Sequence, residues 1–555
     1  MGKIVSSQVS NHFVEFCLSI KASVYMALPS NCSVISCVML SAEQSAACVK
    51  LSSEPTRNFF ITGMPGSGKS YIIREFLKKL PPSVQVGATA MSAASAAFLD
   101  GSYLGSFLGV DRVTESTTLQ QMIDEIAANP FSLKRIALLN TLVIDDVNAL
   151  SIDYFELVDL AFRHFRNRLL PFGGVRIILA GDFMQLHAFV KLSRGGSTGT
   201  SMIKIGQSYC FQSKVWRALD FVSIRLDGYY RGGDLGVILK ELGEGAMSDA
   251  TVQLLNSRKT PLEGKFSKLF DIQNASKDTF RTSAGKMVIC AHSARAVEIN
   301  NMLVKEKRSE RQGPPRAYQA TTTPPLPLDA DPDELEEMEA LFRFGDEVKL
   351  RQWTRVRLLK TARILASEST DYLGPNHPSE TITARYGTLG WVNSFASAGT
   401  VTKKSHLGLL GEFGSPDQMA VEVLLEGGEY FFVGMAEEEV QKQESSWSRV
   451  QIPLEAAYAL TTHKVMGCEF KEVIIAMTDD NRLFPGQFLT ALSRSKYLKD
   501  VTIDHNLSIE FMNSGPHPEV QKFYFKTFPH INFAWTKKKP DQIVIGTKRS
   551  HQLIE

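Results

Sequence analysis

Apolar residues occur along this chain in short runs that end in polar or glycine-rich segments, the pattern expected of strands buried inside a sheet. Such runs lie at residues 58–62, 141–147 and 175–180, and helical periodicity follows the first of them at residues 71–77. Strand followed by helix is the repeating unit of open α/β sheets. The pattern in the first half therefore predicts an α/β domain.

The second half carries a different pattern. Residues 344–350, 384–393 and 420–426 are short apolar segments separated by glycine-rich turns, which predicts β-strands. Two further stretches predict exposed chain: the Pro-rich and acidic segment 321–339 as a linker or flap, and the Gly/Ser/Thr-rich segment 193–201 as a mobile loop.

The first apolar run leads directly into a phosphate-binding loop. The eight residues that match G-x-x-x-x-G-K-[ST], all predicted nucleotide contacts, are Gly63, Met64, Pro65, Gly66, Ser67, Gly68, Lys69 and Ser70. Their backbone N–H groups and the following helix N-terminus favour an anion, Lys69 adds a charge for the phosphates, and Ser70 is the predicted magnesium ligand. The chain is therefore predicted to bind a nucleoside triphosphate with Mg²⁺, and the resemblance described below implies ATP.

Two later strands end in side chains that suit the same chemistry. The run 141–147 delivers Asp145 to the predicted magnesium shell and places Asp146 where it can polarise the attacking water. The run 175–180 leads to Asp182 and Gln185, at the end of a strand where ligands of open sheets bind. An amide at that position can sense the γ-phosphate.

Composition sets limits on the class of protein. The chain has 555 residues, 44% of them hydrophobic and 22% charged, which suits an ordinary globular protein of several domains. A net charge of +2 requires that any nucleic-acid path be a local basic groove. The seven scattered cysteines include no C-x-x-C pair, which favours reduced thiols in an intracellular protein over a disulfide framework or a zinc site.

Residues 1–39 differ from the rest of the chain. They are serine-rich and nearly free of acidic residues, which leaves two interpretations open, a targeting segment or a folded N-terminal addition. A membrane span is not expected, because Pro29, Asn31 and several serines interrupt the apolar stretch. The serine-rich, acid-poor N-terminus favours a mitochondrial location, with the nucleus as the alternative, and the short basic patch 537–540 is of a kind that is more often merely solvated.

The order of these motifs, from about Leu40 to about Asp500, resembles the PIF-type DNA helicases, the PIF/RecD-like group of superfamily 1. The segments that carry the resemblance are 40–44, 89–97, 101–109, 153–157, 171–174, 211–216, 226–231, 457–467 and 485–494. The stretch from 153 to 174 is the most discriminating match. The resemblance implies two RecA-like P-loop domains with an inserted small β-barrel.

The resemblance also implies domain boundaries and residue roles. The expected parts are an N-terminal extension 1–39, a first RecA-like domain 40–220, a second in two parts, 221–343 and 451–515, a barrel 344–450 and a C-terminal tail 516–555. By resemblance, the nucleotide site includes Gln44 for adenine, Gly467, Gln185 as γ-phosphate sensor, and Arg231 and Arg494 as arginine fingers. The implied contacts to single-stranded DNA are Thr89, Ser92, Ser106, His463 and Lys464.

A basic cluster in the predicted barrel has two interpretations. Five positive charges lie between Arg351 and Arg363, with Trp353 among them. They predict either phosphate contacts with base stacking or one solvated face of an amphipathic helix.

The chain departs from the family pattern at coupling positions. Asp146 stands where glutamate is usual, one methylene shorter, and Val465 and Met466 replace a Ser-Gln pair. Two functions therefore stay open: an ATP-dependent 5′-to-3′ DNA helicase acting in replication, repair or recombination, or a hydrolysis-poor ATP- and DNA-binding subunit of a maintenance complex. An RNA helicase of the same superfamily is a further rival. Expected partners are single-stranded DNA and duplex junctions, and the chain is expected to be a monomer with unknown protein partners.

Overall fold

The structure is a computed structural model, and it describes residues 40–110, 113, 117–187, 209–231, 233–260, 286–305, 313–326, 338–339, 341–365, 380–397, 408–410, 419–426, 430–442, 445–478, 483–505, 507–508 and 515–530. The predicted extension 1–39, the predicted loop 193–201 and the basic patch 537–540 lie outside these residues. The chain divides into two compact units, residues 1–45 and 46–555, and helix α2, Ala42–Ser53, spans the division.

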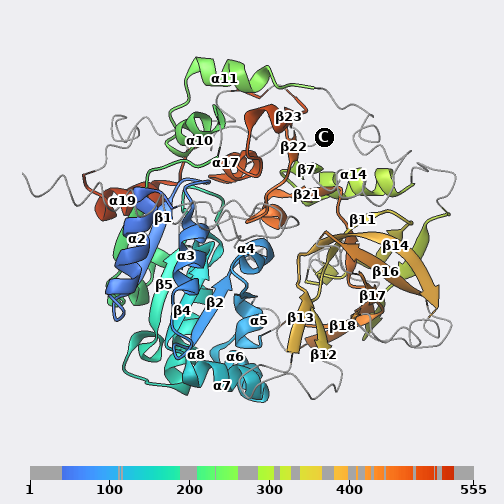
Figure 1. Cartoon of the computed structure of the whole chain (residues 1–555). Coiled ribbons are helices and arrows are strands. Elements are labelled where there is room, and N and C mark those ends of the chain that lie inside the picture. The colour runs from blue at the N-terminus through green and yellow to red at the C-terminus, as the bar shows by residue number, and fades with distance from the viewer. Residues whose placement is uncertain are drawn as a thin grey trace, which may run out of the picture. The chain divides into compact units, whose positions relative to one another are not determined.

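The first sheet has six parallel strands in the order β3-β2-β4-β5-β1-β6. They are β1, Phe59–Gly63; β2, Val86–Ala90; β3, Ser102–Tyr103; β4, Thr141–Asp145; β5, Arg176–Ala180; and β6, Val222–Leu226. Every residue of β1, β4 and β5 is buried, which explains why these strands appear in the sequence as unbroken apolar runs. Figure 1 draws this sheet in colours from blue to green.

Helices connect these strands and pack with them around one core. They are α3, Lys69–Lys78; α4, Ala93–Phe98; α5, Leu104–Leu108; α6, Leu119–Ala128; α7, Pro130–Leu138; α8, Ile152–Phe165; and α9, Lys214–Ala218. Several begin at residues that cap a helix well: Thr118 forms a capping box with Gln121 at α6, Asn129 precedes Pro130 at α7, and Ser151 caps α8.

The first domain is larger than the predicted range 40–220. Strand β6 pairs with β1 along its whole length, so the predicted boundary at residue 220 is too early. The predicted C-terminal tail also contributes, because residues Pro518–Thr527 form helix α19. The Phe523 ring stacks on Phe211 at 4.2 Å between centroids, and Tyr524 is 1% exposed. At least this part of the predicted tail belongs to the core of the first domain.

The second sheet has four parallel strands in the order β21-β7-β22-β23. They are β7, Lys286–Cys290; β21, Ala459–Thr461; β22, Glu472–Ala476; and β23, Val501–Ile503. The helices of this region are α10, Leu235–Gly243; α11, Asp249–Asn256; α14, Ser293–Lys305; and α17, Gln487–Leu492. The sheet thus combines strands from both sides of the insertion, as a split second RecA-like domain requires.

The insertion is built of strands and is drawn mainly in yellow and orange in Figure 1. Its main sheet has the order β15-β17-β16-β14-β11-β20, and smaller sheets pair β10 with β8, β12 with β13, and β18 with β19 and β9. The bounds are β8, Arg316–Gln319; β9, Thr321–Thr323; β10, Glu347–Leu350; β11, Arg355–Leu358; β12, Ala362–Leu365; β13, Glu380–Ala384; β14, Leu389–Ser397; β15, Gly408–Leu410; β16, Met419–Leu425; β17, Tyr430–Val433; β18, Ala436–Lys442; β19, Ser445–Gln451; and β20, Leu454–Ala456. The β-rich region is therefore present, and its closure into a small barrel stays a prediction.

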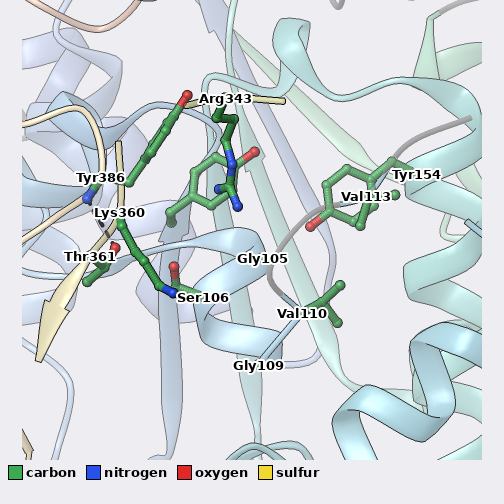
Figure 2. Close-up of a pocket in the computed structure, with 11 residues that line it drawn as sticks. Gly105, Ser106, Gly109, Val110, Val113, Tyr154, Arg343, Lys360, Thr361 and Tyr386 are labelled. Atoms are coloured by element: carbon green, nitrogen blue, oxygen red, sulfur yellow. Dashed lines mark hydrogen bonds between the residues drawn. The ribbon is translucent and has the colours of Figure 1, made fainter. Parts of the chain in front are cut away.

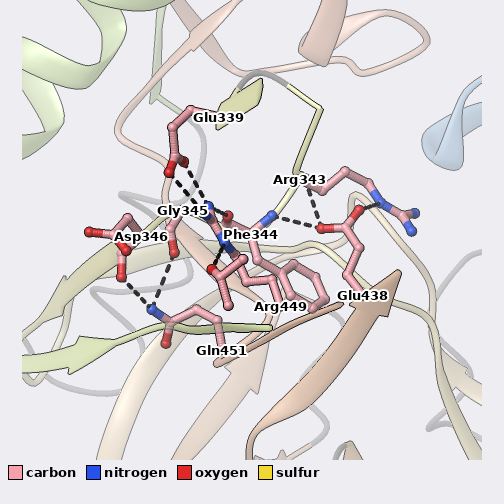
Figure 3. A network of polar contacts seen from close by, with 9 residues as sticks. Glu339, Arg343, Phe344, Gly345, Asp346, Glu438, Arg449 and Gln451 are labelled. Atoms are coloured by element: carbon pink, nitrogen blue, oxygen red, sulfur yellow. Dashed lines mark hydrogen bonds and ion pairs between the residues drawn. The ribbon is translucent and has the colours of Figure 1, made fainter. Parts of the chain in front are cut away.

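Buried charges fasten the start of the insertion to strands β18 and β19, as Figure 3 shows. The Arg449 guanidinium donates two hydrogen bonds of 2.8 Å to Glu339 and lies 3.9 Å from the centre of the Phe342 ring. The Glu438 carboxylate accepts from the backbone N–H and the side chain of Arg343. Glu339, at the end of the predicted exposed linker or flap, is thus held by an arginine that is 1% exposed.

Within the described residues, no helix combines the length and the apolar character that a membrane span requires.

We expect Tyr524→Ala to lower the free energy of unfolding by roughly 3–5 kcal/mol, because it removes a buried ring from the core of the first domain. Phe525→Ala, which truncates the next residue on the exposed side of α19, is the control. It should change the free energy of unfolding by less than about 0.5 kcal/mol. Urea unfolding followed by tryptophan fluorescence measures both. Equal effects of the two substitutions would show that α19 does not belong to this core.

Candidate functional site

The phosphate-binding loop joins the buried strand β1 to helix α3. Gly66 and Gly68 have φ values of +86° and +88°, which residues with a side chain rarely adopt. The loop can therefore turn its N–H groups inward. Lys69 donates hydrogen bonds to the carbonyls of Gly63 at 2.6 Å and Met64 at 3.1 Å. Burial lowers the pKa of the Lys69 ammonium, although the nearby Asp182, Asp145 and Asp146 oppose that shift. A phosphate at this loop would compensate the buried charge.

Ser70 and Asp145 form the candidate metal site. The Ser70 hydroxyl donates to the Asp145 carboxylate at 2.5 Å, which brings two oxygen ligands together at the end of β4. Burial, and then the neighbouring Asp146, raise the pKa of the Asp145 carboxyl to about 7. A buried carboxylate beside a hydroxyl has the hard oxygen donors that Mg²⁺ prefers, so these two residues fit the predicted ion. Among the described residues there is no cluster of three or more His, Cys, Asp or Glu arranged to bind a metal.

The carboxylate of Asp146 contacts the first turn of α4. Its Oδ2 atom accepts hydrogen bonds from Ser92 at 2.5 Å and from Ser95 at 2.6 Å. Asp146 itself has a left-handed backbone with φ of 54°, and its N–H donates to Asp145. The candidate water-activating group is therefore bound to the segment that the resemblance assigns to DNA, and Ser95 is a contact that the sequence did not reveal.

Gly467 approaches the same cluster from the second domain. A Cβ atom at Gly467 would lie 2.0 Å from the Ser92 hydroxyl, 2.7 Å from that of Ser95 and 2.9 Å from the Asp146 carboxylate. Its φ of +74° also favours glycine. The structure thus places Gly467 against Asp146 and α4. Its contact with the nucleotide stays a prediction.

Gln185 and Arg494 meet across the two domains. The Arg494 guanidinium donates to the Gln185 side-chain oxygen at 3.1 Å, and the Gln185 amide donates to Asp182 at 3.3 Å. Burial, and then the nearby Arg231, lower the pKa of Arg494 to about 10. Asp182 in turn accepts a hydrogen bond of 3.3 Å from the Tyr524 hydroxyl. The predicted γ-phosphate sensor and the predicted finger are therefore direct partners.

Arg231 lies beside the phosphate-binding loop. Its side-chain carbons are 3.0 and 3.1 Å from the position that a Cβ atom of Gly66 would take. Its guanidinium donates to the carbonyl of Ser493 at 2.5 Å and pairs with Glu469 at 3.1 Å. Both predicted arginine fingers are thus anchored at the same edge of the second domain, next to the loop.

The residues predicted to contact DNA differ in burial and in the partners that they bind. The Thr89 side chain is fully buried, and its hydroxyl donates to the Val143 carbonyl, so the prediction that this side chain contacts DNA is wrong. The Ser92 hydroxyl is bound to Asp146. Lys464 is exposed and pairs with Glu455 at 2.6 Å, and burial lowers the pKa of His463 to about 4. Contacts of DNA with Ser106, His463 and Lys464 stay predictions.

Within the basic cluster at 351–363, Arg355 and Arg357 fit neither of its two interpretations, whereas phosphate contacts by the other basic residues stay a prediction. Arg355 and Arg357 lie in strand β11, not in a helix, and both are buried. Arg355 pairs with Glu426 and Arg357 with Glu455, each at 2.8 Å. These arginines stabilise the insertion, and they reach their partners through strand pairing that the local sequence does not specify.

Gln44, the candidate adenine contact, lies in the first turn of α2. Its side-chain oxygen accepts from the Ser41 N–H at 3.1 Å, and its own N–H donates to the Ser41 hydroxyl at 3.2 Å. This reciprocal pair is a capping box in geometry, so Gln44 also stabilises the start of its helix. Its contact with adenine stays a prediction.

Comparison with known proteins places the chain among helicases. Residues 39–231 match the family model described as PIF1-like helicase. The ATP-dependent DNA helicase PIF1 of Rattus norvegicus is 26% identical over 452 residues, covering 80% of this chain and 58% of that protein. The human PIF1 helicase is 25% identical over 473 residues, covering 84% and 61%. The chain thus spans about three fifths of the length of these relatives.

Solved structures show the same fold. The crystal structure of Pif1 helicase from Candida albicans has a TM-score of 0.66 at 20% identity, covering 89% of this chain and all of that one. The Bacteroides Pif1 helicase in complex with ADP-AlF3 and ssDNA has a TM-score of 0.58 at 19% identity, covering 88% and 97%. The predicted resemblance to the PIF-type helicases is therefore confirmed, as are the two RecA-like domains.

The pKa of His187, two residues after Gln185, predicts a pH dependence of stability. Burial, and then the nearby His463 and His517, lower this pKa from 6.5 to about 4. Between these values the unfolded chain binds the proton and the folded chain does not, so stability falls as the pH drops from about 6.5 to about 4, by roughly 3 kcal/mol. Thermal unfolding measured across this pH range should show that His187→Phe loses less stability on acidification than the wild type does. The same substitution at the exposed His164 should keep the wild-type pH profile, and an unchanged profile in both variants would contradict the buried neutral state.

Proposed function

We propose that the chain is an ATP-dependent DNA helicase of the PIF1 type that translocates along single-stranded DNA. The observation that carries this proposal is the hydrogen bond between Gln185 of the first domain and Arg494 of the second. It joins a buried positive charge of the second domain to Gln185, which follows strand β5 of the first domain. Phosphoryl transfer is accelerated mainly by such charge stabilisation.

Each residue of the site has a defined task in this proposal. Lys69 and the loop N–H groups bind the phosphates, and Ser70 with Asp145 would hold Mg²⁺, which supplies further neutralising charge when bound. Gln185 orients groups at the γ-phosphate. Arg231 and Arg494 stabilise the charge that develops during transfer. Because both arginines are attached to the second domain by Ser493 and Thr490 carbonyls, hydrolysis is linked to the distance between the domains.

The coupling to DNA is proposed to run through the first turn of α4. Ser92 and Ser95 contact Asp146, and Gly467 lies against all three. A shift of either domain would therefore displace the Asp146 carboxylate. Alternating opening and closing of the domains would then produce steps along the strand.

The finer assignments are part of the same proposal. By analogy with the PIF-type helicases, the direction is 5′ to 3′, the substrates are single strands and duplex junctions, and the processes are replication, repair or recombination. The protein acts as a monomer in the mitochondrion, with the nucleus as the alternative. Competition between DNA and RNA strands distinguishes this proposal from an RNA helicase.

A second function is favoured by one specific observation. The short carboxylate of Asp146 accepts hydrogen bonds from Ser92 and Ser95, which direct it toward α4. Such a site suits an ATP- and DNA-binding subunit of a maintenance complex that hydrolyses ATP poorly.

Lys69→Ala is expected to lower DNA-stimulated ATP hydrolysis about 100-fold or more, since it removes the charge on the phosphates. Turnover with and without single-stranded DNA, together with circular dichroism, measures activity and folding. Lys78→Ala, at the exposed end of the same helix, is the matched control and should keep the wild-type rate. Unchanged turnover in folded Lys69→Ala would sink the ATPase assignment.

Asp146→Glu separates the two functions. If the chain is an active helicase, the longer side chain disturbs the contacts with Ser92 and Ser95, and the turnover rate falls or stays the same. A rise of about tenfold or more, in the range that general-base catalysis supplies, would instead identify the native site as hydrolysis-poor.

A further inference from the structure

The Tyr524 hydroxyl is enclosed by three groups of the first domain. Its oxygen lies 2.6 Å from the Thr62 hydroxyl and accepts a hydrogen bond of 3.3 Å from the Phe183 N–H. The hydroxyl itself donates to the Asp182 carboxylate at 3.3 Å. Thr62, Asp182 and Tyr524 are each at most 2% exposed, so water does not compete for these contacts. A residue of the predicted C-terminal tail thus supplies a polar group deep inside this domain.

The hydrogen bonds around this hydroxyl have one direction. A phenol has a single O–H to donate, and an ionised carboxylate can only accept. Two further donors contact the Asp182 carboxylate, the Met184 N–H at 3.1 Å and the Gln185 side-chain amide at 3.3 Å. Thr62 therefore donates to Tyr524, and Tyr524 donates to Asp182. The series begins in the strand before the phosphate-binding loop and ends at the carboxylate that Gln185 contacts.

The Asp182 carboxylate depends on these donors because it is buried. Burial raises the pKa of the Asp182 carboxyl, and Lys69 together with the three donors opposes that shift. The Tyr524 hydroxyl thus favours the ionised state, in which Asp182 accepts the Gln185 amide. Gln185 in turn accepts from the Arg494 guanidinium at 3.1 Å. Two hydrogen bonds therefore separate Tyr524 from the side chain that is predicted to sense the γ-phosphate.

Helix α19 fixes the place of this hydroxyl. The Phe523 ring stacks on Phe211 at 4.2 Å between centroids and lies edge to face with the Phe183 ring at 5.6 Å. Phe183 thus contacts α19 twice, through its ring and through the N–H described above. Val520, one turn earlier in the helix, is fully buried. Because this core is closely packed, the hydroxyl is held in one position relative to Asp182.

A second tyrosine of the same core lacks such contacts. Tyr154, in α8, is 8% exposed and lines a cavity of about 540 Å³, which Figure 2 shows. Among the described residues its hydroxyl has no hydrogen-bond partner, whereas the Tyr524 hydroxyl has three. Burial alone therefore does not place a tyrosine hydroxyl in a hydrogen-bond network.

We propose that Tyr524 is a positioning residue for ATP hydrolysis. Its hydroxyl holds the Asp182 carboxylate in the orientation that directs the Gln185 side chain to the γ-phosphate. Tyr524 acts through Asp182 and not on the nucleotide itself, because its side chain is 1% exposed. The inference rests on the proposed function, because it takes ATP hydrolysis as the reaction. It gives helix α19 a task in catalysis in addition to its place in the core.

The test compares the kcat and the KM for ATP of the full-length protein at saturating single-stranded DNA. Tyr524→Phe keeps the ring and removes only the hydroxyl. The kcat should fall roughly tenfold to 100-fold, because a displacement of about 1 Å near the reacting groups has an effect of that order. The KM should change by less than about threefold, because Lys69 and the loop that binds the phosphates are unaltered.

Two control variants separate positioning from packing. Tyr154→Phe removes the buried hydroxyl that has no partner among the described residues, and it should keep the wild-type kcat. Val520→Ala truncates a fully buried side chain of α19 and retains the Tyr524 hydroxyl. It should lower the urea midpoint at least as much as Tyr524→Phe does, yet keep a kcat close to that of the wild type. Equal losses of kcat in Val520→Ala and Tyr524→Phe would show a merely structural role and overturn the inference.

A double-mutant cycle tests the connection through Gln185. In protein that already carries Gln185→Ala, Tyr524→Phe should lower the kcat no further, because the group that the hydroxyl orients is absent. Losses that multiply in the double variant would contradict this connection and overturn the inference.

The reference for all these rates is Lys69→Ala. If the wild type exceeds that background and folded Tyr524→Phe keeps the wild-type kcat, the inference alone fails and the proposed ATPase stands. If the wild type hydrolyses ATP no faster than Lys69→Ala, the proposed function fails, and the inference fails with it.

Discussion

The buried guanidinium of Arg494 is the interaction on which the arrangement of the site depends. Burial of a cation is unfavourable unless its protons have partners. Arg494 donates to the Thr490 and Cys468 carbonyls, the Ser493 hydroxyl and the Gln185 side chain. These partners are neutral, so they fix the orientation of the charge without cancelling it. The first domain contributes one of the four, Gln185, which means that the geometry of the cation requires both domains. In the proposed function, binding of an anion and closure of the domains are therefore parts of one equilibrium.

The first turn of α4 is the second point where distant parts of the chain converge. Ser92 caps the helix and also donates to Asp146, so one hydroxyl stabilises both the helix and the orientation of the Asp146 carboxylate. Gly467 of the second domain lies against that hydroxyl, and a Cβ at Gly387 of the insertion would lie 2.9 Å from Ala93. Side chains larger than hydrogen do not fit at either glycine without movement of the neighbours. Close packing here transmits displacement, because there is no free space to absorb it.

The sequence predicted the strands, the loop and the carboxylate positions of the candidate nucleotide site, because these signals are local. Strands β1, β4 and β5 are buried on both faces, so their apolar runs are continuous, and the loop and carboxylates follow directly in the chain. Strand β6 is half-buried over most of its length, which weakens its apolar signal, and its place in the first sheet depends on pairing with β1. The burial of Arg355 and Arg357 depends on glutamates about 70 and 100 residues away. Such partners are specified by the fold and not by neighbours in the sequence.

Helix α19 has a consequence for how the protein is made. It follows every other described element in the chain, yet its Phe523 packs on Phe211 and its Tyr524 hydroxyl lies 2.6 Å from that of Thr62, in the strand before the phosphate-binding loop. A ribosome therefore releases the first domain with part of its core still missing, and the insertion and second domain are synthesised before that part emerges. The nucleotide site reaches its final packing only after translation has passed residue 527, so nascent chains that stop earlier expose the apolar surface that α19 covers.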